Sequence, residues 1–421
     1  MDQGNTAFLL IAAALVLLMT PGLAFFYGGL VKAKSVISMM MMSFGAIGLI
    51  GVLWAIYGYA IAFPGAEGTI FPWSIDTGAL FLNNLLEVPE GAAYPPLAFV
   101  AFQATFAIIT VALVSGAIAD RAKFGAWMVF AGVWATVVYF PVASWVFNFG
   151  LAEDGSFAYG GWLTHGLQDV FGLGTIDFAG GTAVHINAGA AALALALVLG
   201  KRVGFAKGAH VPHNPPFVLL GAGLLWFGWF GFNAGSELAA DGTAALAFVN
   251  TIIAPAAALL AWLVVEKIKD GKPTSIGAAS GAVAGLVAIT PACASLTPGW
   301  AMLLGVLAGV ICALAIDLKF KLGFDDSLDV VGIHLVGGLV GTLYLGFFAT
   351  GTGLVFSGSG TQLLVQAIAA FSVLVYSFVL AFVIGFIIEK TMGFRVKNED
   401  EVAGIDLVVH GEEGYVLADA K

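Results

Sequence analysis

The sequence has few charged residues and almost no cysteine. Only 10% of its 421 residues are Asp, Glu, Lys or Arg, and its two cysteines are Cys293 and Cys312. A soluble domain has roughly 25% charged residues, so this charge content excludes an ordinary soluble protein. Both cysteines lie in apolar stretches, where a small buried side chain is the simplest interpretation.

Apolar residues and glycine make up most of what is present. Hydrophobic residues account for 60% of the chain, and there are 56 glycines. This much apolar surface requires a lipid bilayer as solvent, and each crossing needs about 20 apolar residues. Small residues also let membrane helices pack closely. The composition predicts an all-α, multi-pass protein of the cell (plasma) membrane, surrounded by lipid and without a nucleic-acid partner.

The first apolar run has no basic residue before it. The chain begins with Met1, Asp2 and Gln3, and the run extends from Phe8 to Leu30. A cleaved signal peptide has a positive start and a shorter apolar core, so we expect a retained first span. Hydropathy predicts eleven spans, near residues 7–31, 36–63, 97–119, 124–149, 178–200, 214–236, 246–266, 275–293, 299–317, 330–350 and 361–389.

The basic residues test this count, because Lys and Arg accumulate in cytoplasmic loops. With the N-terminus outside, all 16 fall in inner loops or in the C-terminal tail. A missed or added span would spoil this partition, so we predict eleven transmembrane helices, an outer N-terminus and an inner C-terminus. The basic residues are Lys32, Lys34, Arg121, Lys123, Lys201, Arg202, Lys207, Lys267, Lys269, Lys272, Lys319, Lys321, Lys390, Arg395, Lys397 and Lys421.

The outer loops carry acidic residues without basic partners. Such a surface attracts cations and repels anions. The alternative is that orientation alone removes the basic residues and that the acids only solvate the loops. The acids are Asp2, Glu67, Asp76, Glu87, Glu90, Glu153, Asp154, Asp169, Glu237 and Asp241.

Residues 397–421 differ in character from the rest of the chain. They hold seven acidic residues against Lys397 and Lys421. A segment this short cannot fold alone, so we expect it to be disordered or to dock on the inner loops. We predict two parts, a transmembrane domain at residues 1–396 and an acidic cytoplasmic tail at residues 397–421.

Two spans contain an acid followed closely by a histidine. Residues 177–189 read DFAGGTAVHINAG, and residues 329–341 read DVVGIHLVGGLVG. Each stretch closes a group of five spans, so spans 1–5 and 6–10 would form an inverted repeat, with span 11 last. Inverted repeats place transport sites near the membrane midplane. At 1.5 Å per residue, His185 and His334 reach that region from opposite sides.

His185 and His334 lie within spans, whereas the other four histidines lie in loops or in the tail. An ionisable group at membrane depth is costly and indicates function. A structural histidine and a metal or haem ligand are the alternatives. A metal centre would lack ligands, because the spans hold no further histidine, no paired cysteine and few acids. We expect no metal or cofactor, and interpret the pair as imidazoles that line a pore.

Asp177 and Asp329 stand at helix starts, before small residues. A carboxylate at such a position caps the free backbone amides of the first helical turn. We expect both residues to be N-caps, with direct contact to a substrate as the alternative.

Aromatic residues form a second group, near the outer ends of three spans. Aromatic faces bind cations, worth about 2 kcal/mol when desolvated, and a hydroxyl accepts a hydrogen bond from the same cation. The alternative is an ordinary interfacial belt with lipid-facing phenylalanines. The residues are Phe102 and Phe106 on one face of span three, Trp145 in span four, and Trp229, Phe232 and Ser236 on one face of span six.

Taken together and in order, these motifs resemble the ammonium transporter family (Amt/Mep/Rh), in its prokaryotic Amt branch. The resemblance covers nearly the whole chain, and seven successive matches are highly specific. The matching stretches are PGLAFFYGGLV from Pro21, FQATFAIITVALVSGAIADR from Phe102, DFAGGTAVHINAG from Asp177, WFGWFGFNAGS from Trp226, GKPTSIGAASGAVAGLVAITPA from Gly271, DDSLDVVGIHLVGGLVGTL from Asp325 and GIDLVVHGEEGY from Gly404.

This resemblance implies a homotrimer with one pore through each subunit. It implies an outer ammonium recruitment site of Trp145, Phe106 and Ser236, with Phe102 beside it. Phe106 and Phe232 would form a stacked phenyl gate beneath that site.

The resemblance also implies roles deeper in the pore. His185 and His334 would be the twin imidazoles of a hydrophobic pore, and Trp229 a neighbouring structural residue. Asp177 would be the family's essential acid near the entrance. Asp329 would be the acid that organises the inner end.

The implied activity is transport of ammonium, or of its analogue methylammonium, for nitrogen uptake. Ammonium would lose a proton below the outer site, and ammonia would pass the histidines. A PII-type signal protein would bind at the cytoplasmic face, where HGEEGY at residues 410–415 matches the prokaryotic style. Val408 replaces a phosphorylatable Thr of plant relatives, and Ser144 replaces a His of some bacterial relatives.

Three other functions are weighed against this interpretation. An ammonium sensor usually carries a signalling domain after the last span, and 25 tail residues are too few. An intramembrane enzyme would need a nucleophile or metal ligands beside the Asp/His pair, and the sequence offers none, so we expect no enzyme. A neutral ammonia channel, without net charge movement, stays open because a residue list does not reveal how the proton is routed.

Overall fold

The computed structural model describes residues 1–65, 73–151, 157–205 and 211–415. Seven residues that belong to the acidic, basic and histidine groups of the sequence analysis lie outside these ranges. They are Glu67, Glu153, Asp154, Lys207, His210, Asp419 and Lys421.

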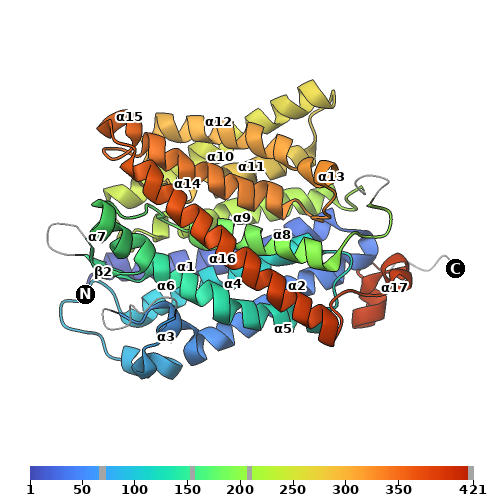
Figure 1. The fold of residues 1–421 in the computed structure, drawn as a ribbon, viewed down its shortest axis with the longest axis horizontal. Helices are drawn as coiled ribbons and strands as arrows, with labels where there is room; N and C mark the ends of the chain where they lie inside the picture. The colour runs from blue at the N-terminus through green and yellow to red at the C-terminus, as the bar shows by residue number, and fades with distance from the viewer. Residues whose placement is uncertain (66–72, 152–156, 206–210, 416–421) are drawn as a thin grey trace.

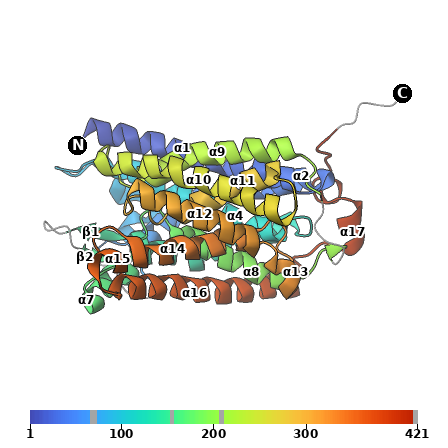
Figure 2. The same ribbon diagram turned by 90° about the horizontal axis from the view of Figure 1, so that it is seen from above.

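Long apolar helices run side by side along the long axis of the molecule (Figures 1 and 2). Within the described ranges, ten helices are long and apolar enough to cross a membrane. This confirms the predicted all-α membrane fold. The ten extend over Gln3–Leu30, Ala33–Ala62, Pro96–Ile118, Phe124–Phe147, Gly181–Leu199, Pro215–Gly235, Gly242–Lys269, Pro298–Leu322, Val331–Phe348 and Thr361–Thr391.

Several of these spans are composite, because a 3₁₀ or π-helical turn continues an α-helix. The first half contains α1 (Gln3–Leu30), η1 (Ala33–Ser35), α2 (Val36–Leu53), η2 (Trp54–Gly58), α3 (Tyr59–Ala62), η4 (Thr77–Leu85), α4 (Pro96–Val114), η5 (Ser115–Ile118), α5 (Phe124–Trp134), η6 (Ala135–Tyr139), α6 (Phe140–Phe147), β1 (Phe149–Leu151), β2 (Phe157–Gly160), η7 (Trp162–Gly166), α7 (Leu167–Phe171), η8 (Gly181–Ile186) and α8 (Asn187–Leu199). The second half contains α9 (Pro215–Gly235), α10 (Gly242–Lys269), α11 (Ser275–Ile289), α12 (Pro298–Ala315), α13 (Leu318–Leu322), η10 (Val331–Leu335), α14 (Val336–Phe348), α15 (Leu354–Ser357), α16 (Thr361–Thr391), α17 (Asn398–Ala403) and η11 (Asp406–His410).

The eighth predicted span corresponds to α11, which has only 15 residues. At 1.5 Å per residue it is roughly 22 Å long, which is shorter than a hydrocarbon core of about 30 Å. Turns continue the chain beyond it, where the Ala292 and Ser295 amides donate to the Ile289 and Ala292 carbonyls. The count of eleven spans therefore stays a prediction.

A short hairpin was not foreseen in the all-α prediction. The fourth span ends at Phe147, and Asn148 leaves the helix in an extended conformation. Strands β1 and β2 then pair antiparallel, with Phe149 opposite Gly160. The hairpin lies at the end of the molecule away from α17 (Figure 2).

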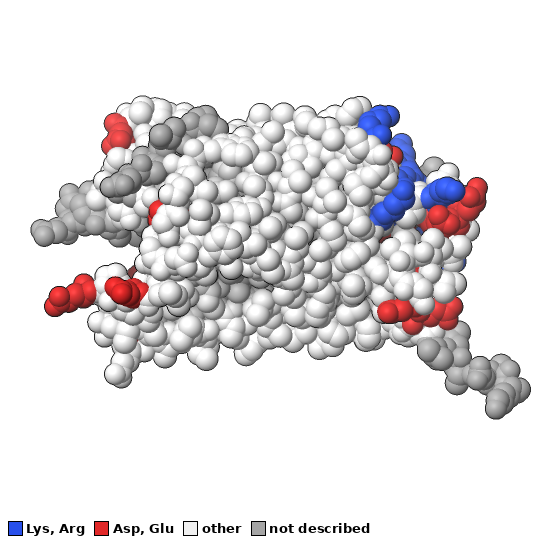
Figure 3. Space-filling model, turned by 90° about the horizontal axis from the view of Figure 1, so that it is seen from below, with Lys and Arg blue, Asp and Glu red and all other residues white. Residues whose placement is uncertain are grey.

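On the face shown in Figure 3, charged residues lie at the two ends of the helix bundle, and the visible side between them is uncharged. On the face shown, Lys and Arg gather at one end, together with some acids, whereas the opposite end shows acids alone. The N-terminus and α17 also lie at opposite ends (Figure 1). This distribution agrees with the predicted charge partition, and which end faces the cytoplasm stays a prediction.

Glycines allow the first helices of the two halves, α1 and α9, to approach closely. A Cβ added to Gly221 would lie 2.2 Å from the backbone nitrogen of Phe26, so no larger residue fits. In the second half, a Cβ on Gly305 of α12 would lie 2.1 Å from the Ala254 oxygen of α10. Close backbone contact of this kind provides the dispersion energy that holds membrane helices together.

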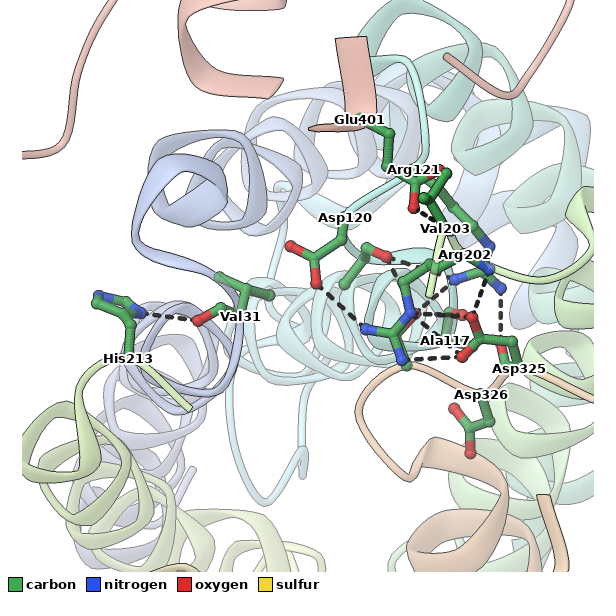
Figure 4. Close-up of polar contacts among 12 residues, drawn as sticks. Val31, Ala117, Asp120, Arg121, Arg202, Val203, His213, Asp325, Asp326 and Glu401 are labelled. Atoms are coloured by element: carbon green, nitrogen blue, oxygen red, sulfur yellow. Dashed lines mark hydrogen bonds and ion pairs between the residues drawn. The ribbon is translucent and has the colours of Figure 1, made fainter. Parts of the chain in front are cut away.

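A buried ion-pair network ties the loops together at the basic end (Figure 4). Arg202 forms ion pairs with Asp325 at 2.8 Å and with Asp120 at 3.2 Å. Arg121 donates through Nη2 to the Asp325 carbonyl at 2.6 Å. The network joins the loops that follow the third and fifth spans to the loop that precedes the tenth.

The described part of the acidic tail docks on this end. The Glu401 carboxylate accepts a hydrogen bond from the Val203 amide at 2.6 Å and pairs with Arg395 at 2.8 Å. Asp406 accepts hydrogen bonds from the Ile37 and Ser38 amides at 3.0 and 2.7 Å, at the start of α2. Of the two expectations for the tail, docking is the one that the structure has.

Candidate functional site

The two histidines within the spans meet in the interior of the bundle. His185 and His334 are both buried, and their Nδ1 atoms lie 3.2 Å apart. Their ring centroids are 5.3 Å apart, with the planes inclined by 26°. A small cavity of about 10 Å³, room for roughly one water molecule, adjoins the rings. It is lined by Met19, Leu23, Phe26, Ile109, Leu113, Val184, His185, Leu225, Trp229, Phe232, Val283 and His334.

Two glycines explain why the histidine-bearing helices come so close. Gly189 follows His185 by four residues, and a Cβ there would lie 2.5 Å from the Leu335 amide nitrogen. Gly338 follows His334 by four residues, and a Cβ there would lie 3.2 Å from the Cβ of His185. Each glycine therefore makes room for the opposite helix one turn beyond its own histidine.

Each histidine lies in a π-helical turn whose start is capped by an aspartate. Asp177 accepts hydrogen bonds from the Gly181 amide, from the Thr182 amide and hydroxyl, and from the Ala183 amide. This arrangement confirms Asp177 as an N-cap. π-Helical turns are frequent at functional sites, because the extra residue reorients the side chains.

The second cap is Asp326 rather than Asp329, so the prediction for Asp329 was wrong. Asp326 accepts hydrogen bonds from the Val330 and Val331 amides at 3.1 and 2.7 Å. Asp329 instead forms an ion pair with Lys319 at 2.5 Å. The backbone of Asp329 is left-handed, with φ +63°, and its carboxylate points to Lys319 instead of the helix-start amides.

This correction also shifts the register of the repeat by three residues. Asp177 precedes His185 by eight residues, and Asp326 precedes His334 by the same number. Gly180, with φ +110°, and Asp329, with φ +63°, occupy equivalent left-handed positions three residues after each cap. The equal spacing was visible in the sequence, and it would have identified Asp326.

Two phenyl rings lie above the histidines. Phe106 of α4 and Phe232 of α9 are stacked, with centroids 4.0 Å apart and an angle of 12° between the planes. Phe232 also lies 6.2 Å from the His185 ring and lines the small cavity. The stacked pair separates that cavity from a larger one on the side of Phe106.

This larger cavity, here called the outer cavity, has a volume of about 660 Å³. Its wall is aromatic and polar, and the described residues that line it include no Lys, Arg or His. The lining residues are Tyr59, Phe63, Gly65, Tyr94, Phe99, Gln103, Phe106, Val146, Phe147, Asn148, Phe149, Tyr159, Thr164, Thr175, Ile176, Asp177, Phe178, Ser236, Glu237 and Leu238.

Trp145 does not join Phe106 and Ser236 at this cavity, contrary to the prediction. Its ring contacts Tyr376 at 4.6 Å and Trp162 at 5.7 Å, and it lines a separate groove beside α16. Two residues further along, Phe147 lines the outer cavity and meets Phe106 edge-on at 6.3 Å. The helix ends at Phe147, and this position faces the cavity where Trp145 faces away from it.

The remaining predicted residues surround these two cavities. Ser236 lines the outer cavity, and its hydroxyl donates to the Phe232 carbonyl at 2.8 Å. Phe102 is fully buried behind Phe106, with ring centroids 4.8 Å apart, and does not line the cavity. Trp229 stacks on His185 at 5.5 Å, and its indole nitrogen donates to the Thr290 hydroxyl at 2.8 Å.

Comparison with known proteins places this arrangement in a family. The sequence model of the Ammonium Transporter Family matches residues 7–415. The chain belongs to the ammonium transporter family. An ammonium transporter of Mycobacterium tuberculosis is 54% identical over 445 residues, which cover 99% of this chain and 91% of the relative.

Solved structures of the family share the fold of this ammonium transporter. Candida albicans Mep2 has a TM-score of 0.86 and 31% identity, over 99% of this chain and 94% of its own. A protein described as a Sensor Amt Protein also has a TM-score of 0.86, with 28% identity over 97% of this chain and 98% of its own. This chain is therefore similar to family members described as transporters and to one described as a sensor.

Membership has direct consequences for this ammonium transporter. It is a multi-pass integral protein of the plasma membrane, and its family and relatives are transporters, not enzymes. Among its described residues, no group of three or more His, Cys, Asp or Glu side chains is placed to hold a metal ion.

Proposed function

We propose that this protein recruits ammonium in the outer cavity, removes a proton from it, and conducts ammonia past His185 and His334. One observation carries the proposal. The stacked rings of Phe106 and Phe232 divide an aromatic, acid-lined cavity from a narrow apolar cavity that ends at two touching imidazoles.

Recruitment depends on the outer side of the phenyl stack. Phe106 and Phe147 present two ring surfaces to a cation, and Ser236 adds a hydroxyl oxygen. A desolvated cation–π contact is worth about 2 kcal/mol. Phe147 takes the place that the resemblance gave to Trp145, and Phe102 holds Phe106 from behind.

Loss of a proton makes the next step possible. The small cavity is lined largely by Met, Leu, Ile, Val and aromatic side chains, and it has room for roughly one water molecule. A naked cation in such surroundings costs many kcal/mol, whereas neutral ammonia avoids most of that cost. Potassium has no proton to lose, so it is rejected at this step.

The histidine pair supplies hydrogen bonds where water is excluded. His185 Nε2 has no hydrogen-bond partner among the described residues, so it is available to a passing ammonia molecule. The stacking of Trp229 and the Asp177 cap hold the His185 turn in place. The released proton either returns to the outer side or is relayed through the imidazoles.

We further propose a homotrimer with one pore in each subunit, and a PII-type signal protein as the partner of the inner face. The docked tail supports the second proposal, because Glu401 and Asp406 connect it to the loop after the fifth span and to the start of α2. A protein that displaces this tail would act on the loop after the fifth span, where Arg202 pairs with Asp120 and Asp325.

The decisive experiment is ammonium-evoked current in proteoliposomes, with potassium and sodium as controls. A saturable current specific to ammonium supports electrogenic transport with a proton crossing beside His185 and His334. Vesicle alkalinisation without current would show a neutral ammonia channel instead. The absence of both signals would overturn the proposal.

A further inference from the structure

The outer cavity contains a carboxylate that the mechanism above does not use. Glu237 follows Ser236 directly after the end of α9, is half-buried, and lines the cavity. Its amide donates to the Ala234 carbonyl at 3.2 Å, and the Leu238 amide donates to the Gly235 carbonyl at 3.0 Å. The chain around Glu237 thus continues the last helical turn, so its backbone is held in place.

The backbone after Glu237 is strained. Leu238 has φ +60°, a left-handed conformation that is uncommon for a residue with a branched side chain. This turn reverses the chain between α9 and α10 while Ser236, Glu237 and Leu238 all face the cavity. Strain of this kind clusters at binding sites, where the surrounding structure holds it.

Glu237 and Asp177 are the two carboxylates of the described cavity wall, and they are engaged differently. Asp177 is committed to the amides at the start of η8. In the described part of the chain Glu237 caps no helix. Its carboxyl group forms a side-chain hydrogen bond with Asp241, which caps α10 through the Thr243 and Ala244 amides. When both carboxyl groups are ionised this hydrogen bond is lost, and the charge of Glu237 then acts on the cavity that it lines.

Two buried polar atoms in the same wall indicate that a ligand binds there. Gln103 and Thr175 are 7% and 4% exposed, and both line the cavity. Gln103 Oε1 and Thr175 Oγ1 make no hydrogen bond within the described part of the chain. Buried polar atoms are normally satisfied by water or by a bound group. Acceptors of this type suit a small donor of N–H groups.

We propose that Glu237 captures cations for the outer cavity and sets the affinity for ammonium, with Gln103 and Thr175 as acceptors for the N–H groups of ammonium. This inference rests on the proposed function and assigns it a further positioning residue. A fixed negative charge in a cleft with low-dielectric walls raises the local concentration of a cationic substrate. It changes how much ammonium reaches Phe106, and it leaves the later steps unaltered.

The capture depends on the protonation of Glu237. Burial raises the pKa of Glu237 to about 7, and the charge of Asp241 and the side-chain hydrogen bond with it add to the shift. The other titratable groups that face the cavity or this turn are Asp177, Asp241, Tyr59, Tyr94, Tyr159 and Cys293. Glu237 is thus largely charged at pH 8 and largely neutral at pH 6, a range in which ammonium itself stays protonated.

The test compares ammonium uptake by wild-type protein, Glu237→Gln and Glu237→Asp in proteoliposomes at pH 6 and pH 8. Glu237→Gln should raise KM about five-fold at pH 8, with little change at pH 6, because the Glu237 carboxyl group concentrates the cation only when it is ionised. The maximal rate should stay within about two-fold of wild type, since later steps are untouched. Glu237→Asp should be intermediate.

Glu90→Gln is the matched control, because Glu90 is an exposed acid of the predicted outer loops that does not line the cavity. An equal rise of KM in this control would overturn the inference in favour of a general surface-charge effect. An unchanged KM for Glu237→Gln at pH 8 would overturn it as well.

Calorimetric binding of methylammonium to detergent-solubilised protein separates the two proposals. Weaker binding by Glu237→Gln, in a protein that transports nothing, would overturn the proposed function and retain the role of Glu237. Saturable uptake with identical binding by wild type and Glu237→Gln would overturn the role of Glu237 alone.

Discussion

The Nδ1 atoms of His185 and His334 lie 3.2 Å apart, although 149 positions separate the two residues in the chain. A hydrogen bond between them requires one ring to donate and the other to accept. The two neutral rings then carry their protons on different nitrogens. One Nε2 is an acceptor and the other a donor, so the pair presents two unlike ends to the pore.

Replacing both histidines tests this relationship. His185→Leu with His334→Leu should lower ammonium uptake about ten-fold or more, or abolish discrimination against potassium, because no polar group then remains to bind ammonia in the dry segment. Each single variant should have nearly the full effect, since it leaves the partner Nδ1 unpaired. Uptake and potassium competition in proteoliposomes provide the measurement.

His165→Gln is the control for the histidine variants, because His165 lies in η7 and pairs with Asp169 outside the pore. It should transport as wild type does. Unchanged transport and selectivity in the double variant would contradict the role of the imidazole pair.

Opening the phenyl stack should weaken the exclusion of hydrated cations. Phe106→Ala with Phe232→Ala removes two rings that lie 4.0 Å apart between the cavities. We expect water to enter the small cavity and potassium to compete measurably with ammonium, because a wetter path lowers the cost of a charge. Phe382→Ala, at a 38% exposed position of α16, is the control. Complete rejection of potassium by the double variant would count against the stack as the barrier.

The two aspartate caps should contribute comparably to stability. Asp177→Ala and Asp326→Ala each leave buried helix-start amides without an acceptor, which costs about 1–3 kcal/mol. Asp2→Ala removes the exposed cap of α1 and should cost less, about 0.5–1 kcal/mol. Thermal unfolding in detergent measures these differences. If Asp329→Ala destabilised more than Asp326→Ala, the revised register of the repeat would be wrong.

Removing Arg202 should strongly destabilise the basic end of the bundle. Arg202→Gln removes the cation that forms ion pairs with the buried Asp120 and Asp325, and removing one member of a buried ion pair typically costs about 3–5 kcal/mol. Lys321→Gln, at an exposed position of α13, should change stability by less than about 0.5 kcal/mol. A lower unfolding temperature and faster proteolysis of the tail are the expected readouts. Equal behaviour of the two variants would exclude a structural role for the network.

The same network should make stability depend on acidity. Burial alone would raise the pKa of Asp325, but the hydrogen bonds and charge of Arg202 outweigh it and hold that pKa below its usual range. A carboxylate with a lowered pKa stabilises the folded state above its unfolded pKa, about 3.9, and this contribution disappears as pH falls through the lower folded value. Unfolding temperatures from pH 6 down to pH 3 should therefore drop more steeply for wild type than for Arg202→Gln. Parallel profiles would contradict this assignment.

The sequence by itself was sufficient to predict the membrane environment, the positions of the helices and the two histidines within them. Few charges and long apolar runs leave a bilayer as the environment, and the observed helices lie at the predicted places within a few residues. An imidazole within an apolar span is rare because its burial is costly, so His185 and His334 were recognisable without any contact. Their meeting was predicted from an inverted repeat, which would send the two spans through the membrane in opposite directions.

Only the tertiary structure decided which side chains of each element face the pathway. Trp145 and Phe147 differ by two positions, and the end of α6 at Phe147 determines which of them reaches the outer cavity. Asp326 replaced Asp329 as the cap because a left-handed residue after the cap turns the second carboxylate toward Lys319. The strained turn at Leu238 brings Glu237 to the wall of the outer cavity. Backbone conformations of this kind arise from packing between distant segments, so local sequence does not specify them.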